Sequence, residues 1–168
     1  MINKFELVKR ILTDLGVNPD RLTLEWVSAA EAPRFVNAIT AFTRRIQSLG
    51  PLGSGEGLDA QRLGVKLKAA KMALEGRRVR MVFARQAKYM KHEGGYRKLP
   101  SDHKLHVELE KVLKAEISAN GLLLHLQKRP RKLDELVDLL DLSSEDVLAY
   151  FEKLEKKGLV ESDRLIRA

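Results

Sequence analysis

Apolar residues near the start of the chain recur at the spacing of one helix face and predict an α-helix over about residues 3–15. After a turn, apolar and polar residues alternate. This pattern places Leu22, Leu24 and Trp26 on one face of a predicted strand, with Trp26 expected in the core. Apolar residues then step by four and three as far as Gly50, which predicts a second helix. The opening of the chain therefore predicts a helix–strand–helix unit.

The second helix has an ambiguous beginning. Ser28 and Glu31 have the spacing of a capping box, but Pro33 would then stand at the fifth helical position and remove one backbone hydrogen bond. The predicted strand raises a second question, because a single strand leaves its edges unpaired. Its neighbours must come from later in this chain or from another protein.

The centre of the chain is less regular. Residues 53–57 are rich in glycine and predict a flexible link, followed by a third amphipathic helix over about residues 63–74. Residues 78–83 alternate and allow a strand, which is a candidate partner for the first. Residues 84–103 have no persistent period and are expected to be mostly loop.

The last third predicts helices in close succession. Apolar spacing indicates one long helix or two consecutive ones over about residues 105–126, with Gly121 as the weak point. A short helix over about 132–141 and a third over about 143–157, capped by Ser143, come next. Two apolar pairs within residues 159–166 predict a short hairpin. This order is typical of a winged helix-turn-helix.

These elements predict an α+β protein that is mostly helical, in three parts. Residues 1–52 form the α/β helix–strand–helix unit, an incomplete Rossmann-like half. Residues 53–103 form a basic connecting segment with one helix and a candidate strand. Residues 104–168 form the winged-helix domain.

The net charge of +8 is concentrated in the centre of the chain. Residues 61–104 contain 13 basic and 3 acidic residues, whereas residues 1–60 contain 7 of each and residues 105–168 contain 11 basic and 13 acidic. Three interpretations stay open: a solvated helix face, contact with an acidic protein surface, or contact with nucleic acid. The candidate partner-docking residues, apolar and basic together, are Leu22, Leu24, Trp26, Arg62, Lys66, Arg78, Arg80, Arg85 and Lys88.

A winged helix-turn-helix also suggests a DNA-binding transcriptional regulator, which is the alternative function. The candidate recognition helix begins with Ser144, Glu145 and Asp146, whereas a helix that enters the major groove needs basic or amide side chains at its leading end. Docking to another protein fits this charge better.

Candidate chemistry is sparse. The chain has no cysteine, so it offers no thiol nucleophile and no thiolate ligand for zinc or an iron–sulfur cluster. His103 and His106 share one helix face but lack a third ligand at a sensible spacing, and no nucleophile–base pair stands out. We therefore expect no catalytic, cofactor-binding or metal-binding residue in this chain. With no membrane-spanning run and no signal peptide, we expect a cytoplasmic location.

Part of the sequence resembles a known family. The run LTLEWVSAAE over residues 22–31, then Arg34-Phe35 and LGPL over residues 49–52, is similar to the C-terminal part of the methyl-viologen-reducing hydrogenase delta-subunit family. The resemblance covers about a third of the chain. The basic segment and helix-turn-helix tail resemble an extension that some members carry.

The resemblance implies a role in anaerobic electron transfer. Family members carry a [2Fe–2S] cluster on a cysteine-bearing segment that precedes the region matched here, and they pass electrons to a flavin-containing reductase subunit. This chain starts at Met1, where the match begins, and cannot ligate the cluster. The resemblance therefore implies a non-catalytic docking subunit of a hydrogenase or heterodisulfide-reductase complex, with [2Fe–2S] and FAD in partner subunits. A separate cysteine-bearing half of the same family is one candidate partner.

Overall fold

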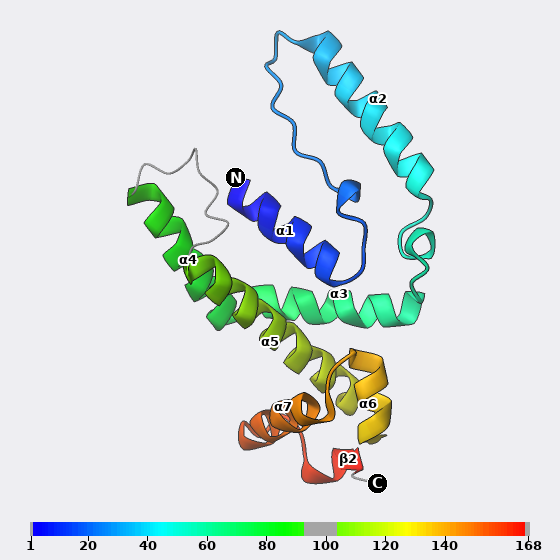
Figure 1. Cartoon of the computed structure of the whole chain (residues 1–168), viewed down its shortest axis with the longest axis vertical. Helices are drawn as coiled ribbons and strands as arrows, with labels where there is room; N and C mark the ends of the chain where they lie inside the picture. Colours follow the sequence, from blue (N-terminus) through cyan, green and yellow to red (C-terminus); the bar gives the residue numbers. More distant parts are fainter. Residues whose placement is uncertain (1, 93–103, 167–168) are drawn as a thin grey trace. The chain divides into compact units, whose positions relative to one another are not determined.

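The structure is a computed structural model that describes residues 2–92 and 104–166 (Figure 1). The chain divides into two compact units, Met1–Gly64 and Val65–Ala168. Helices make up most of the described residues, and the sheet found there has two short parallel strands. The prediction of a mostly helical chain is therefore confirmed. None of the helices described combines the length and the apolar character that crossing a membrane requires.

The N-terminal unit begins with α1 (Ile2–Asp14), as predicted, and continues with η1 (Pro19–Arg21) and α2 (Ala32–Leu49). Asn18 caps η1 by accepting a hydrogen bond from the backbone of Asp20 at 2.9 Å. A short turn, η2 (Ser54–Glu56), leads to α3 (Ala60–Glu75), which continues into the C-terminal unit. The predicted third helix is therefore confirmed.

Two predictions for this part of the chain are wrong. Residues 22–27 run extended but pair with no strand among the described residues, so the predicted helix–strand–helix unit lacks its strand. Residues 53–57 are not a flexible link, because η2 orders them. The start of α2, which the sequence left ambiguous, lies at Ala32, and this puts Pro33 in the first turn, where a missing N–H costs nothing.

The C-terminal unit contains an antiparallel pair of helices, α4 (Arg77–His92) and α5 (Lys104–Lys128), which pack along each other (Figure 1). The predicted strand over 78–83 is wrong, because these residues lie in α4 with Val79 and Val82 buried at helical spacing. The loop predicted over 84–103 is wrong as far as His92, and its remainder lies outside the described residues.

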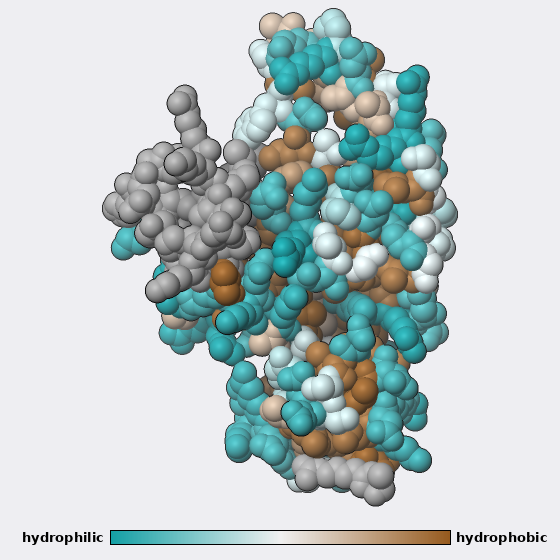
Figure 2. Space-filling model, in the orientation of Figure 1, coloured by the Kyte–Doolittle hydropathy of each residue, from teal (hydrophilic) through white to brown (hydrophobic). Residues whose placement is uncertain are grey.

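The end of α5 packs with α6 (Leu133–Leu140) and α7 (Ser144–Lys156) around the main core. Ser143 caps α7, as predicted, by accepting a hydrogen bond from the backbone of Asp146 at 3.1 Å. The side chains that are almost fully buried in this core are Leu122, Leu126, Leu136, Val147 and Phe151. Figure 2 shows further apolar surface around α6.

Gly121 does not interrupt α5, so the long helix predicted there is a single one. The predicted hairpin within residues 159–166 is wrong. Residues 162–164 form a turn, η4 (Ser162–Arg164), and β2 (Leu165–Ile166) pairs in parallel with β1 (Arg131–Lys132). The pairing joins the two ends of the helical core, because β1 precedes α6 and β2 follows α7.

Candidate docking surface

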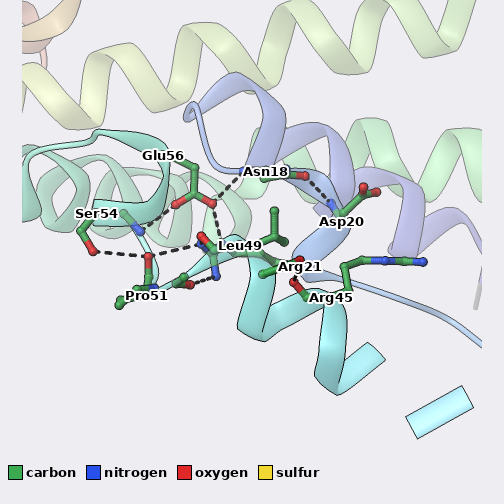
Figure 3. Close-up of polar contacts among 11 residues, drawn as sticks. Asn18, Asp20, Arg21, Arg45, Leu49, Pro51, Ser54 and Glu56 are labelled. Carbon is green, nitrogen blue, oxygen red and sulfur yellow. Dashed lines mark hydrogen bonds and ion pairs between the residues drawn. The ribbon is translucent and has the colours of Figure 1, made fainter. Parts of the chain in front are cut away.

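Arg21 connects the two ends of a long segment in the N-terminal unit (Figure 3). Its guanidinium donates to the backbone carbonyls of Gly50 at 2.8 Å, Leu49 at 3.1 Å and Pro51 at 3.2 Å. Its Nε donates to Glu56 Oε1, and both side chains are only 9% exposed. We call Arg21, Glu56 and these three carbonyls the clasp. The clasp fixes the end of η1 against the end of α2.

Glu56 is held by further donors inside the clasp. Its carboxylate accepts hydrogen bonds from the backbone N–H groups of Gly53 at 2.9 Å and Asn18 at 3.3 Å. The hydrogen bond from the Arg21 side chain is the largest cause of a lowered pKa for this carboxyl, and these two backbone bonds lower it further. Glu56 is therefore ionised at neutral pH and a charged partner for Arg21.

The sequence-based interpretation missed the clasp, because a single arginine and a glutamate 35 residues apart carry no local signal. The glycine-rich residues around Glu56 were the one clue. A Cβ on Gly55 would lie 2.1 Å from the carbonyl oxygen of Leu49, so only glycine allows the chain to pass there. Gly53 has a φ of +84°, which other residues rarely adopt.

Between the two clasped ends lies an arm, residues 22–49, which consists of an extended segment followed by α2. The N–H of Leu22 donates to Pro19 and that of Ser28 donates to Glu31. Residues 23–27, between these bonds, make no hydrogen bond within the described chain. Trp26 is 60% exposed, so its predicted place in the core is wrong.

The second half of the arm is an amphipathic helix that packs chiefly against the short turn η1 in the described part of the chain. Its predicted apolar stripe has the expected spacing, but no residue of α2 is buried. Phe35 is 56% and Ile39 50% exposed. Amphipathic helices in folded proteins normally owe their stability to packing of the apolar face, and a large exposed apolar patch marks an interaction site. The arm is therefore the main candidate docking surface of the N-terminal unit.

The predicted basic docking residues lie on α3 and α4. Arg62 and Lys66 lie on α3, on either side of the boundary between the two units. On α4, the side of the helix opposite Val79 and Val82 carries a basic face, which we define as Arg77, Arg80 and Lys88. All three of these side chains are exposed, and none forms an ion pair with another residue of the described chain.

The other two predicted residues of α4 have partners on α5. Arg78 forms an ion pair with Glu116 at 2.7 Å, and Arg85 forms one with Glu108 at 3.0 Å. Both arginines are more than half exposed, so each pair contributes little to stability. The structure therefore separates the predicted set into an apolar group on the arm, two basic residues on α3, two arginines paired across the α4–α5 interface, and an open basic face on α4.

Metal-binding geometry is absent from the part of the chain that the structure describes, where no three histidine, aspartate or glutamate side chains gather. His103, one half of the predicted histidine pair, lies outside the described residues.

The part of the chain that contains α1 and the arm is similar to segments of known proteins. Residues 1–50 match the family model described as methyl-viologen-reducing hydrogenase, delta subunit. A 51-residue stretch is 41% identical to a subunit of the ferredoxin:CoB-CoM heterodisulfide reductase of Methanosarcina mazei, and it covers 30% of this chain and 6% of that protein. No solved structure matches significantly.

The shorter relatives come from hydrogenases. A 50-residue stretch is 40% identical to the iron-sulfur subunit of the F420-non-reducing hydrogenase of Archaeoglobus profundus, covering 30% of this chain and 36% of that protein. The corresponding iron-sulfur subunit from Methanocaldococcus jannaschii is 40% identical over 48 residues, which are 29% of this chain and 36% of that protein. The match thus spans about a third of these relatives. The predicted resemblance to the delta-subunit family is confirmed over residues 1–50, in a chain without the cysteines of a cluster.

Proposed function

From the likeness of residues 1–50 to hydrogenase delta subunits, we propose that this chain is a non-catalytic structural and docking subunit of an anaerobic electron-transfer complex. The complex is of the hydrogenase or heterodisulfide-reductase type, and it acts in the cytoplasm. The relatives' names, which describe a hydrogenase iron-sulfur subunit and part of a ferredoxin-dependent heterodisulfide reductase, support this class of complex.

The exposed apolar arm is the observation that carries the proposal. Completing the burial of each half-exposed side chain, such as Phe35 or Ile39, is worth about 1 kcal/mol. Trp26 adds the largest apolar side chain of the unit at 60% exposure. A few such residues together supply the free energy of a specific contact, so a partner protein that covers the arm explains both its composition and its exposure.

The basic face of α4 offers a second contact to the rest of the complex. Arg77, Arg80 and Lys88 attract an acidic protein surface and speed its encounter, an effect that weakens as salt rises. The C-terminal helices, which were predicted to belong to a winged helix-turn-helix, then act as a protein-docking module and do not bind DNA, since the first turn of α7 carries Glu145 and Asp146.

The cofactors of the proposed complex belong to its other subunits. This chain has no cysteine, so a [2Fe–2S] cluster has no thiolate ligand here, and the partners hold the iron–sulfur and FAD groups. One of these partners is a separate, cysteine-bearing half of the delta-subunit family. The chain's own contribution is to hold cofactor-bearing subunits together.

Anaerobic purification of the tagged full-length chain from its native cells tests this function. We expect a stable complex that contains iron, acid-labile sulfide and flavin, with iron–sulfur and flavoprotein subunits identified by mass spectrometry. The same purification is then repeated with the Phe35→Glu, Ile39→Glu double variant, which places charge on the apolar face of α2. This variant should lose the partners at least about tenfold, since two contacts of about 1 kcal/mol each are removed.

Two results would contradict the proposal. One is a chain that purifies alone, or with the same proteins whether or not α2 carries the two glutamates. The other is binding to duplex DNA that is salt-sensitive but survives competitor DNA near physiological ionic strength, which would favour the transcriptional regulator.

A further inference from the structure

We infer that the extended segment of the arm, residues 23–27, receives a β-strand from the partner subunit. This inference rests on the proposed function and specifies how the partner binds. The partner is the remaining portion of a hydrogenase-delta-type domain carried by a different polypeptide. Its strand pairs with this segment while the rest of that portion covers the apolar face of α2.

The backbone of the segment is prepared for such pairing. The residues on either side are already bonded to their own neighbours, the N–H of Leu22 to Pro19 and that of Ser28 to Glu31. The N–H and C=O groups of residues 23–27 make no hydrogen bond within the described chain. In an extended segment the unpaired groups of alternate residues point to the same edge, where they can join a ladder with an added strand, which is how proteins recognise partners by β-augmentation.

The side chains of the segment fit a strand that is covered on one face. Leu22, Leu24 and Trp26 alternate with Thr23 and Glu25, and the period of two matches a strand with one apolar and one polar face. Leu22 and Leu24 are already half-buried, whereas Trp26 is 60% exposed. A strand added beside the segment would place new side chains next to Trp26. The indole ring would then have neighbours to pack against.

The order of the elements also favours an added strand that runs parallel to the segment. The segment leads through a short turn into α2, as a strand leads into a helix in parallel α/β sheets. The apolar stripe of α2 is the face such a helix lays on its sheet. One added sheet would therefore pair the segment and cover Phe35 and Ile39 in the same event.

The relatives identify the occupant. In the two hydrogenase iron-sulfur subunits, the matched stretch makes up 36% of the polypeptide, so about two thirds of each relative has no counterpart in the match. The 118 residues that follow position 50 here contribute only two short strands to the described structure, and these pair with each other. The added strand is therefore assigned to a polypeptide that resembles the unmatched part of those relatives.

Two pairs of variants of the full-length chain test strand addition. Leu24→Ala and Leu24→Pro both remove the side chain, but only the second also removes the N–H. Glu25→Ala and Glu25→Pro do the same for the opposite edge, because neighbouring N–H groups of a strand point to opposite edges. The probe is the portion of the Archaeoglobus profundus iron-sulfur subunit outside its match, co-expressed anaerobically, alongside the complex purified from native cells.

We expect at least one proline variant to bind the probe or the native partners about tenfold more weakly than its alanine counterpart. A difference in one pair indicates pairing at one edge, and a difference in both indicates a central position in the sheet. Hydrogen exchange followed by mass spectrometry should slow about 100-fold or more across residues 23–27 in the complex.

The opposing outcomes separate the two proposals. If the native complex forms but neither pair of variants differs and residues 23–27 exchange as fast as in the free chain, strand addition is wrong and docking stands. If the free chain instead pairs with itself at these residues, the occupant is wrong. If neither the probe nor any native partner binds the wild-type chain, both the inference and the proposed function fail.

Discussion

Gly55 is the residue on which the clasp depends most directly. Its Cα passes so close to the end of α2 that a methyl group would meet the Leu49 carbonyl at 2.1 Å and the Arg21 guanidinium at 2.9 Å. Backbone cannot move aside as a flexible side chain can. Among the glycines of the N-terminal unit, the closest approach therefore lies in a stretch whose composition is that of a linker.

Replacing this glycine should loosen the clasp. We expect Gly55→Ala to lower the free energy of unfolding by about 1–3 kcal/mol, because either Arg21 or the end of α2 must shift. Urea unfolding followed by circular dichroism measures the change. The matched control is Gly64→Ala in α3, where an added Cβ meets no atom within 4 Å. This control should raise stability by about 0.5–1 kcal/mol, since alanine favours the helix. Equal effects at the two sites would contradict the close approach.

At the scale of elements, α4 is an amphipathic helix. Its apolar side packs against α5, and its basic side faces solvent. The two sides are separated by arginines that pair with Glu116 and Glu108 of α5. This arrangement orients the helix and leaves the charges of Arg77, Arg80 and Lys88 directed outward.

Charge reversal on this face should weaken partner binding without affecting the fold. For Arg80→Glu with Lys88→Glu, we expect a fall of about tenfold in the association rate at low salt, and little difference from wild type at high salt. Stopped-flow mixing with the purified partner subunits measures the rate. The control is Lys111→Glu with Lys114→Glu, which makes the same change in net charge at exposed positions of α5. If both variants slow association equally, the effect belongs to net charge and not to α4.

The elements also show how far the sequence predicts this fold. Helices with long apolar stripes, such as α5 and α7, were predicted nearly to their ends. The short alternating runs were not, since in residues 78–83 Val79, Val82 and Phe83 have helical spacing, whereas Val79, Met81 and Phe83 have strand spacing. Six residues do not distinguish the two periods. The packing partner decides between them, and in this case the partner is α5.

Only part of the candidate surface can be predicted from the sequence, because the rest depends on contacts between distant residues. The apolar residues of the arm and the basic residues of α4 were identified from local patterns. Trp26 was expected in the core because its spacing predicts burial, but burial requires a second surface, which the described chain does not supply. The clasp was missed because its two charged residues are distant in sequence and meet only after folding.

At the scale of the whole molecule, the hydrophobic core is unevenly distributed. The C-terminal unit holds the extensive cluster around Phe151 and Leu136, whereas few side chains outside α3 are buried in the N-terminal unit, chiefly Ile11, Leu15 and Val17. Local stability depends on buried apolar contacts. The N-terminal unit, which has fewer of them, should therefore open more readily than the C-terminal unit.

The isolated chain should bind an apolar fluorescent dye through the arm and release it on forming the complex. We expect Phe35→Glu with Ile39→Glu to lower the dye fluorescence of the free chain several-fold while the far-ultraviolet circular dichroism stays unchanged. The control pair, Met81→Glu with Val107→Glu, alters two exposed apolar residues of α4 and α5. Equal loss of fluorescence from both pairs would show that the dye does not report on the arm.

The clasp also has an entropic consequence. Arg21 binds a carbonyl 28 residues further along the chain, and bringing the ends of a loop of that length together costs about 3 kcal/mol of chain entropy. This closure is complete before any partner arrives, so association needs to order only the interior of the loop. A loop closed by its own side chains is also independent of what flanks it. Residues 1–50, which contain the interior of this loop, match the family model, and the matching stretches make up 36% of one relative and 6% of another.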